Sequence, residues 1–406
     1  MKNRYLERAI KHSCFTRNKI ALVSGPRQCG KTTLAKMMLS KRAVGRYHNW
    51  DERDFRRVWA RKPSEIIPPS KGAEIPLVVL DEIHKDRLWK RNLKGLYDTL
   101  AARCDFLVTG SARLNVYRRG SDSLLGRYYH FRLHPFSMRE METEDVPGPD
   151  EMMDAVFNQP GGSRRRADDN LKRLMIFGPF PEPLFSQDAE SSALWRKTRE
   201  EIVIREDLRD ISHLTDLGRL EMMAALLPER VGSQFSPASL REDLEVSFDT
   251  VRRWTVYLKE LYYLFEVKPY SRRIPRSLRR EGKVYLWDYG AVRSEAARFE
   301  NLVACHLLKA CHYWTDTGKG RFDLYYLRNK EKQEIDFLIV RDGVPWLPVE
   351  AKLGDTTPSP NWGRFMAALP CNRGLQLVNG KIWKAHTQGD KLVLVANAAE
   401  ALSRFV

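Results

Sequence analysis

The feature that most constrains the fold is a glycine-rich segment between an apolar stretch and a helical stretch. Residues 25–32 read Gly-Pro-Arg-Gln-Cys-Gly-Lys-Thr, which fits the pattern Gly-x-x-x-x-Gly-Lys-Ser/Thr. The apolar residues 19–24 predict a buried strand, and residues 31–39 predict a helix. Backbone N–H groups of such a turn, at the start of a helix, cradle phosphate groups. The segment therefore predicts a nucleotide-binding loop between a strand and a helix.

The chemistry of this loop predicts ATP and Mg²⁺ as cofactors. We expect Lys31 to neutralise the β- and γ-phosphates and Thr32 to place its hydroxyl on Mg²⁺. The residues predicted to contact the nucleotide are Gly25, Pro26, Arg27, Gln28, Cys29, Gly30, Lys31, Thr32 and Thr33.

An apolar stretch that ends in two acids forms the second part of the predicted site. Residues 77–82 read Leu-Val-Val-Leu-Asp-Glu. Asp81 is expected to hold Mg²⁺ together with Thr32, and Glu82 is expected to polarise the attacking water. The alternative is a strand that merely ends in acids, which is less favoured beside a phosphate loop.

Two further positions are predicted to act on the nucleotide. The apolar stretch 105–109 ends in Thr109-Gly110-Ser111, where the hydroxyls of Thr109 and Ser111 would reach the γ-phosphate. Arg127 ends the run Ser-Leu-Leu-Gly-Arg at 123–127 and could stabilise charge in a neighbouring subunit's site. The alternative for Arg127 is a surface arginine.

The rest of the chain alternates in type. Residues 46–50 and 128–133 predict two more strands, so the N-terminal region predicts a parallel sheet covered on both faces. Residues 141–173 are rich in Glu, Asp, Gly and Pro, which predicts a mobile connection or an insertion. Helical periodicity follows over 191–227.

A compact helix-turn-helix pattern comes next. Residues 236–244 and 247–260 predict two helices, and 263–267 and 283–287 predict a hairpin, an order typical of a winged helix. The chain has a net charge of +17, which favours DNA as the partner. The residues predicted to contact DNA are Thr250, Arg252, Arg253, Arg272, Arg273, Arg276, Arg279 and Arg280. The alternatives are a protein-binding winged helix and a solvent-facing arginine loop.

A second carboxylate cluster is predicted near the C-terminus. Residues 334–340 and 346–352 predict an antiparallel strand pair that would bring Asp336 close to Glu350 and Lys352. Glu300 lies on a predicted helix. The set resembles the PD-(D/E)xK nuclease core, in which Asp336 and Glu350 would bind Mg²⁺, Glu300 would support the site and Lys352 would activate water. The alternative is a binding platform that does not cleave.

The chain resembles the AAA+ ATPases, in the archaeal and bacterial branch fused to a domain of unknown function 4143. The resemblance rests on residues 25–33, 77–82, 109–111, 123–127 and 178–183. The resemblance implies a five-stranded sheet and a homo-oligomeric ring or cluster. The chain departs from the pattern in one respect, because no second sensor arginine stands out in its helical region.

The fold expected is α/β. It comprises a P-loop AAA+ domain with a parallel sheet (1–142), a linker and helical lid (143–230), a winged helix-turn-helix (231–290) and an α/β PD-(D/E)xK nuclease-like domain (291–406).

Composition narrows the location and the partners. No run approaches the roughly 18 to 20 apolar residues that span a bilayer, and the charged N-terminus lacks a signal-peptide core. We therefore expect a cytoplasmic protein with no membrane partner. The six scattered cysteines are expected to be reduced.

The function expected is an ATP-driven action on branched or structured DNA, with metal-dependent cleavage as an option. Two alternatives stay open. One is a nucleotide-switched regulatory, defence or toxin–antitoxin protein with a slow ATPase, and the other is an ATP-dependent protein remodeller.

Overall fold

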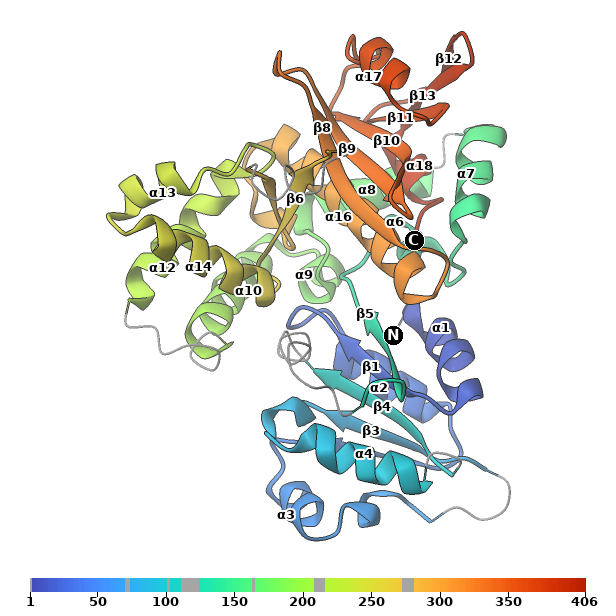
Figure 1. Cartoon of the computed structure of the whole chain (residues 1–406), viewed down its shortest axis with the longest axis vertical. Helices are drawn as coiled ribbons and strands as arrows, with labels where there is room; N and C mark the ends of the chain where they lie inside the picture. Colours follow the sequence, from blue (N-terminus) through green and yellow to red (C-terminus); the bar gives the residue numbers. More distant parts are fainter. Residues whose placement is uncertain are drawn as a thin grey trace. The chain divides into compact units, whose positions relative to one another are not determined.

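The structure is a computed structural model of the whole chain (Figure 1). It describes residues 2–69, 74–100, 103–110, 124–162, 165–207, 216–271 and 281–406. The chain divides into two compact units, Met1–Pro135 and Phe136–Val406.

A five-stranded sheet forms the centre of the first unit. Its order is β2-β3-β4-β1-β5, and every pairing is parallel. The strands are β1 (Ile20–Ser24), β2 (Gly45–Asn49), β3 (Leu77–Asp81), β4 (Asp105–Gly110) and β5 (Tyr128–Arg132). Every residue of β1, β3 and β4 is buried, as expected for central parallel strands. The predicted parallel sheet is confirmed.

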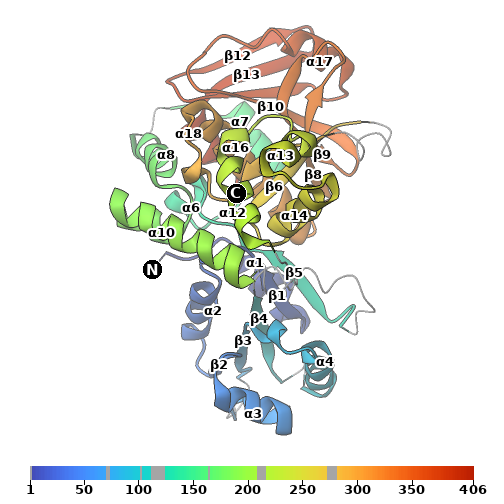
Figure 2. The ribbon, with the colours of Figure 1, turned by 90° about the vertical axis from the view of Figure 1, so that its left-hand side faces the viewer.

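Helices cover both faces of this sheet, and Figure 2 shows α2 and α4 on opposite sides of it. The helices are α1 (Leu6–Ser13), α2 (Lys31–Ser40), α3 (Arg53–Arg61) and α4 (Trp89–Leu100). One core joins Phe55, Trp59 and Leu93 from α3 and α4 to Val78 and Leu80 of β3. The register aligns Asp81 with Thr109, so the polar ends of β3 and β4 lie side by side.

The second unit begins with helices. They are α6 (Met138–Glu142), α7 (Pro149–Asn158), α8 (Arg165–Phe177), α9 (Pro181–Ser186), α10 (Ala189–Glu201), α12 (Leu217–Leu226), α13 (Pro237–Leu244) and α14 (Phe248–Glu260). An irregular, mobile connection over 141–173 is not what the structure shows, because α7 and α8 occupy most of it, whereas an insertion there stays a prediction. Apolar side chains at helical spacing, such as Met152 and Val156 or Leu171 and Leu174, are buried there.

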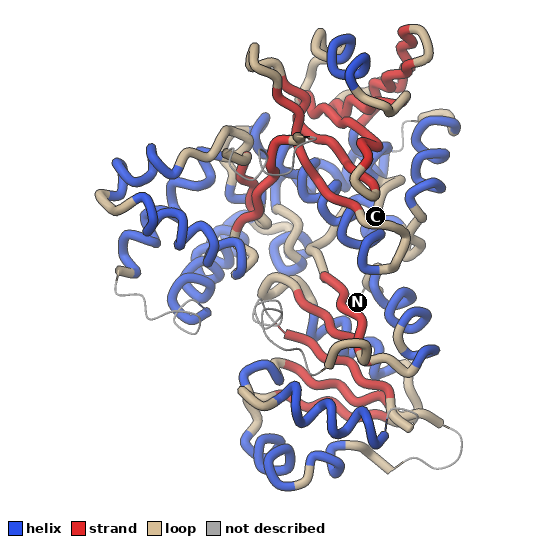
Figure 3. Tube along the Cα trace, in the orientation of Figure 1, coloured by secondary structure: helices blue, strands red, loops and turns tan. Residues whose placement is uncertain are grey.

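An eight-stranded sheet follows, in the order β12-β13-β11-β10-β9-β8-β6-β7. Figure 3 draws the strands in red and the helices in blue. Its strands are β6 (Leu264–Pro269), β7 (Lys283–Leu286), β8 (Phe322–Arg328), β9 (Glu334–Arg341), β10 (Val344–Lys352), β11 (Arg373–Val378), β12 (Trp383–Gln388) and β13 (Lys391–Asn397). The remaining helices are α16 (Glu295–Asp316), α17 (Trp362–Ala368) and α18 (Ala398–Leu402). The predicted antiparallel pairs, β6 with β7 and β9 with β10, are confirmed.

The hairpin β6–β7 continues the sheet of the C-terminal strands, because β6 pairs in parallel with β8 through Lys268 and Tyr325. The boundaries of the four domains drawn from the sequence stay predictions, as does the assignment of α13, α14, β6 and β7 to a winged helix. No described helix is long and apolar enough to cross a membrane.

Candidate nucleotide site and carboxylate cluster

The glycine-rich loop joins β1 to α2 in a conformation that needs its glycines. Gly30 has a φ of 98°, in the left-handed region. A Cβ added at Gly25 would collide with the carbonyl oxygen of Leu133. The loop therefore folds tightly just before the N-terminus of α2, as the sequence predicts.

The side chain of Lys31 folds back onto this loop. Its Nζ donates hydrogen bonds to the carbonyl oxygens of Gly25 at 3.0 Å and of Pro26 at 2.7 Å. Only 7% of the residue is exposed, so the ammonium is held at the loop without a carboxylate acceptor among the bonds it makes there. Phosphate oxygens are stronger acceptors than these carbonyls and could replace them.

Asp81, at the end of β3, is the centre of a hydroxyl cluster. Its Oδ2 accepts hydrogen bonds from Thr32 Oγ1 at 2.7 Å and from the Tyr47 hydroxyl at 2.7 Å. Its Oδ1 accepts a short bond from Thr109 Oγ1. Three elements, α2, β2 and β4, thus deliver a hydroxyl to one carboxylate. The predicted residues Thr32, Asp81 and Thr109 are brought together.

The sequence reasoning missed Tyr47. The alternation of side chains along β2 could have identified it. A tyrosine on the appropriate face of a strand beside β3 can reach the last residue of β3. Burial raises the pKa of the Tyr47 hydroxyl, and the hydrogen bond to Asp81 and the charge of that carboxylate raise it further. Tyr47 therefore stays a neutral donor to Asp81.

Glu82 follows Asp81 with a φ of 57°, which turns the chain sharply at the strand end. Its Oε2 lies 3.5 Å from Nε2 of the buried His84. Burial raises the pKa of the Glu82 carboxyl, and the nearby Lys31 opposes that rise. A carboxylate whose pKa is raised toward neutrality can accept a proton during a reaction, so its place beside the phosphate loop fits a general base.

Arg127 is paired within its own chain. Its Nε and Nη2 donate to the two carboxylate oxygens of Asp98 at 2.6 Å and 3.1 Å. A role in a neighbouring subunit's site stays a prediction, and it would require this pair to open. Ser111 lies outside the described residues.

The second cluster forms where β9 and β10 pair. The register places Phe337 opposite Val349, so Asp336 and Glu350 are neighbours on adjacent strands. The Asp336 N–H donates to Glu350 Oε2 at 3.2 Å, and the Ala351 N–H donates to Asp336 Oδ2 at 3.0 Å. Lys352 Nζ lies 2.8 Å from Glu350 Oε1. The convergence expected from the sequence is present.

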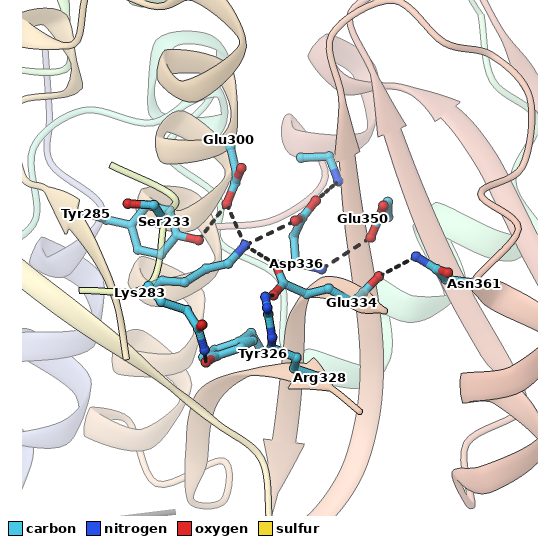
Figure 4. Close-up of polar contacts among 12 residues, drawn as sticks. Ser233, Lys283, Tyr285, Glu300, Tyr326, Arg328, Glu334, Asp336, Glu350 and Asn361 are labelled. Atoms are coloured by element: carbon cyan, nitrogen blue, oxygen red, sulfur yellow. Dashed lines mark hydrogen bonds and ion pairs between the residues drawn. The ribbon is translucent and has the colours of Figure 1, made fainter. Parts of the chain in front are cut away.

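A lysine that the sequence reasoning missed stands in the middle of this cluster (Figure 4). Lys283 Nζ lies 2.5 Å from Glu334 Oε1, 3.1 Å from Glu300 Oε1 and 3.3 Å from Asp336 Oδ1. Lys283 is the first residue of β7, and only 3% of it is exposed. Its strand neighbour Tyr285 donates its hydroxyl to Glu300 Oε1 at 2.7 Å.

Comparisons with known proteins find different families in the N-terminal and the C-terminal part of the chain. Residues 17–142 match the model of a family described as AAA domain, and residues 296–389 match the domain of unknown function DUF4143. Residues 168–301 match a further domain of unknown function, DUF8612. The chain carries an N-terminal AAA-type P-loop ATPase domain and a C-terminal DUF4143 domain.

Among similar proteins, the uncharacterised protein Rv2008c of Mycobacterium tuberculosis is 23% identical over 81% of this chain and 69% of its own. The uncharacterised protein MJ1637 of Methanocaldococcus jannaschii is 24% identical, over 86% of this chain and 78% of its own. Solved structures with a partial likeness include the Walker-type ATPase PABY2304 of Pyrococcus abyssi. It is 13% identical, covers 72% of this chain and 94% of its own, and gives a TM-score of 0.41.

In the AAA domain, the residues present fit a magnesium ion. A threonine hydroxyl and an aspartate carboxylate already in contact offer two of the oxygen ligands that Mg²⁺ prefers, so Thr32 and Asp81 would hold it. In the bound state the ion would neutralise phosphate charge.

In the DUF4143 domain and the adjoining strands, the arrangement does not fit a metal ion as it stands. No three His, Cys, Asp or Glu side chains within the described ranges are placed to hold one ion together. The ammonium of Lys283 already contacts Glu300 and Asp336. The metal roles of Asp336 and Glu350 stay predictions.

Burial shapes the ionisation of this cluster. Burial and the Asp336 charge raise the pKa of Glu300 to about 7, and the same two causes raise the pKa of Glu350 to about 7. Burial alone would lower the pKa of Lys283, but the surrounding carboxylates raise it above its ordinary value. Lys283 is therefore charged throughout the physiological range.

The residues predicted to contact DNA are placed only in part. Thr250 lies in the first turn of α14, where its hydroxyl contacts the N-cap hydroxyl of Ser247 at 2.8 Å. Arg252 and Arg253 are exposed on the same helix. The five arginines between 272 and 280 lie outside the described residues.

Proposed function

We propose that this protein binds ATP with Mg²⁺, hydrolyses it, and couples the turnover to binding or remodelling of DNA. The observation that carries the proposal is the arrangement around Asp81. Hydroxyls of Thr32 and Thr109 meet its carboxylate, next to a loop closed by Lys31. This is the set of groups needed to hold a metal–triphosphate and to respond to its γ-phosphate.

The roles in this mechanism follow from the contacts. Backbone N–H groups at the start of α2 bind phosphate oxygens, and Lys31 leaves its two carbonyl acceptors to neutralise them. Glu82 accepts a proton from, or orients, the attacking water, and its buried environment brings the pKa of its carboxyl closer to neutrality. His84, 3.5 Å away, orients the Glu82 carboxylate.

The DNA part of the proposal is supported by charge and by helix placement. The net charge is +17, and α14 exposes two arginines just after a serine N-cap. Positive side chains at the start of a helix that follows another short helix are suited to backbone phosphates. We further propose a cytoplasmic homo-oligomer in which Arg127 exchanges Asp98 for a neighbour's nucleotide.

The deciding experiment measures ATP turnover without DNA and with duplex, single-stranded and four-way-junction DNA. Lys31→Ala should lose nucleotide binding, and Glu82→Gln should bind ATP while turning over about a hundredfold more slowly or worse. Turnover at the parent rate in both variants would refute the site. Hydrolysis that is slow and indifferent to every DNA would favour a regulatory switch or a protein remodeller instead.

Salt dependence tests the arginine loop separately. Replacing Arg272, Arg273, Arg276, Arg279 and Arg280 with Ser should weaken DNA binding. The slope of log affinity against log salt should become shallower by about 0.9 for each phosphate that the loop no longer neutralises. Unchanged affinity and slope would remove this loop from the DNA interface.

A further inference from the structure

We propose that Lys283 is the built-in cation of the C-terminal carboxylate cluster and takes the place of a divalent metal ion there. The cluster would then hold no divalent metal ion and would not support metal-dependent cleavage. This proposal concerns the second unit alone and does not depend on ATP hydrolysis or DNA binding.

The position of the ammonium is the first observation. Lys283 Nζ meets one oxygen from each of Glu300, Glu334 and Asp336, within 2.5 to 3.3 Å. These acids come from α16 and β9, while the lysine comes from β7, so the ammonium bridges three elements (Figure 4). A metal ligated by the same oxygens at about 2 Å would need the space that the ammonium fills.

The backbone of Lys283 is held on both sides. It pairs with Val267 in the β6–β7 ladder and forms a bridge with Gln234 on the other side. The ammonium of Lys283 also lies 5.7 Å from the centre of the Tyr326 ring. The lysine therefore cannot leave the cluster by a shift of a free strand end.

Two further basic side chains pair with acids of the cluster. Arg328 Nη1 lies 2.9 Å from Glu334 Oε2, and Lys352 Nζ lies 2.8 Å from Glu350 Oε1. The four carboxylates of the cluster thus face three basic side chains inside the protein. Buried carboxylates need such compensation, because an unpaired buried charge is strongly destabilising.

This arrangement makes a distinctive prediction about replacing the lysine. Removing the ammonium leaves Glu300, Glu334 and Asp336 around an empty centre. Without the ammonium between them, these three carboxylates can move inward onto a hard divalent cation, for which carboxylate oxygens are preferred ligands. A neutral side chain of similar length at position 283 should therefore create a metal site that the parent lacks.

The test measures Mn²⁺ binding by the decrease of the free-ion electron paramagnetic resonance signal, in nucleotide-free, full-length protein. Every variant carries Asp81→Asn, so that the ATP site does not contribute. The parent should show no tight site, and Lys283→Met should bind one Mn²⁺ per chain, about tenfold or more tightly than the parent. Adding Asp336→Asn should abolish that binding. Lys283→Arg and Lys352→Met are the matched controls and should resemble the parent.

Thermal unfolding provides the second readout. Lys283→Met should unfold at a lower temperature in EDTA and recover in Mn²⁺, whereas the parent should unfold alike in both. A parent that binds Mn²⁺ in a manner abolished by Asp336→Asn overturns the proposal. A folded Lys283→Met that binds no Mn²⁺ also overturns it.

If Lys283→Met does not fold, the proposal can still be tested on the parent. The parent's own Mn²⁺ titration then decides, because binding that Asp336→Asn abolishes overturns the proposal. A parent without binding, together with a folded and metal-free Lys283→Arg, supports it. None of these outcomes changes the expected ATP turnover of protein with Asp81 intact, so the two proposals fail separately.

Discussion

Two aspartates, one in each unit, show how the same side chain is prepared for different tasks. Asp81 accepts its side-chain hydrogen bonds from hydroxyls of Thr32, Tyr47 and Thr109. Asp336 accepts from the Ala351 N–H and from the ammonium of Lys283. Both carboxylates are well bonded, but only the second is paired with a positive charge by those bonds.

The chemistry of the donors decides what each site accepts. A hydroxyl has lone pairs as well as a proton, so Thr32 can turn from donating to Asp81 to ligating a metal beside it. An ammonium has no lone pair and cannot be a ligand. Neutral donors therefore leave Asp81 ready for a cation, whereas Lys283 already supplies one to Asp336.

The largest expected effect breaks this comparison directly, by removing each charge in turn. Asp81→Asn should lower Mg²⁺-dependent ATP turnover about a hundredfold or more, because metal-borne charge stabilisation is worth several kcal/mol. Asp336→Asn should leave turnover unchanged and lower the unfolding temperature of the second unit, because Lys283 loses a partner. Steady-state ATPase assays and calorimetry on both variants check this.

A reversed result would overturn the distinction between the two aspartates. That result would be normal turnover in Asp81→Asn, or abolished turnover in a folded Asp336→Asn. Glu190→Gln, at an exposed helix position, is the control for the substitution procedure and should match the parent in both measurements.

A smaller effect sharpens the comparison at the hydroxyl cluster. Tyr47→Phe keeps the ring, which lies under Lys36 Nζ at 5.0 Å, and removes only the hydroxyl that orients Asp81. The Mg²⁺ concentration for half-maximal turnover should rise roughly tenfold, as for other partners that orient a metal ligand. A Mg²⁺ titration of ATPase activity measures it.

Tyr97→Phe is the matched control, since its hydroxyl donates to the Asn18 carbonyl at 2.7 Å and serves no carboxylate there. Equal Mg²⁺ dependence in Tyr47→Phe and Tyr97→Phe would mean that Tyr47 does not position Asp81.

Local motifs explain how much of this molecule could be predicted from its sequence. The phosphate loop and the strand ending at Asp81 are contiguous patterns, so their residues and even their contacts could be expected. The pairing of Asp336 with Glu350 was also accessible, because a short hairpin connects them. The AAA domain and the DUF4143 match agree with the resemblance drawn from these motifs.

Contacts between distant elements could not be predicted in the same way. Lys283 precedes Asp336 by 53 positions, and Tyr47 precedes Asp81 by 34, so each contact depends on strand order and register. Composition misled the interpretation of 141–173, where charged residues, Gly and Pro suggested a mobile connection. Buried apolar positions at helical spacing prevailed there over average composition.

The smallest effect concerns pH and the second cluster. Burial and the Asp336 charge raise the pKa of Glu350 from 4.5 to about 7 in the folded protein. Between these values the folded state holds a proton that the unfolded state has released, so rising pH destabilises the fold across that window.

Glu350→Gln removes this titration. Relative to the parent, the variant should therefore gain of the order of 1 kcal/mol in unfolding free energy between pH 5 and pH 8. Urea unfolding of the second unit in EDTA, with Glu190→Gln as control, measures the difference. A relative stability that is constant, or that falls with pH, would show that the pKa of Glu350 is not raised on folding. Lys352 and Lys283 would then offset the cost of burying its charge completely.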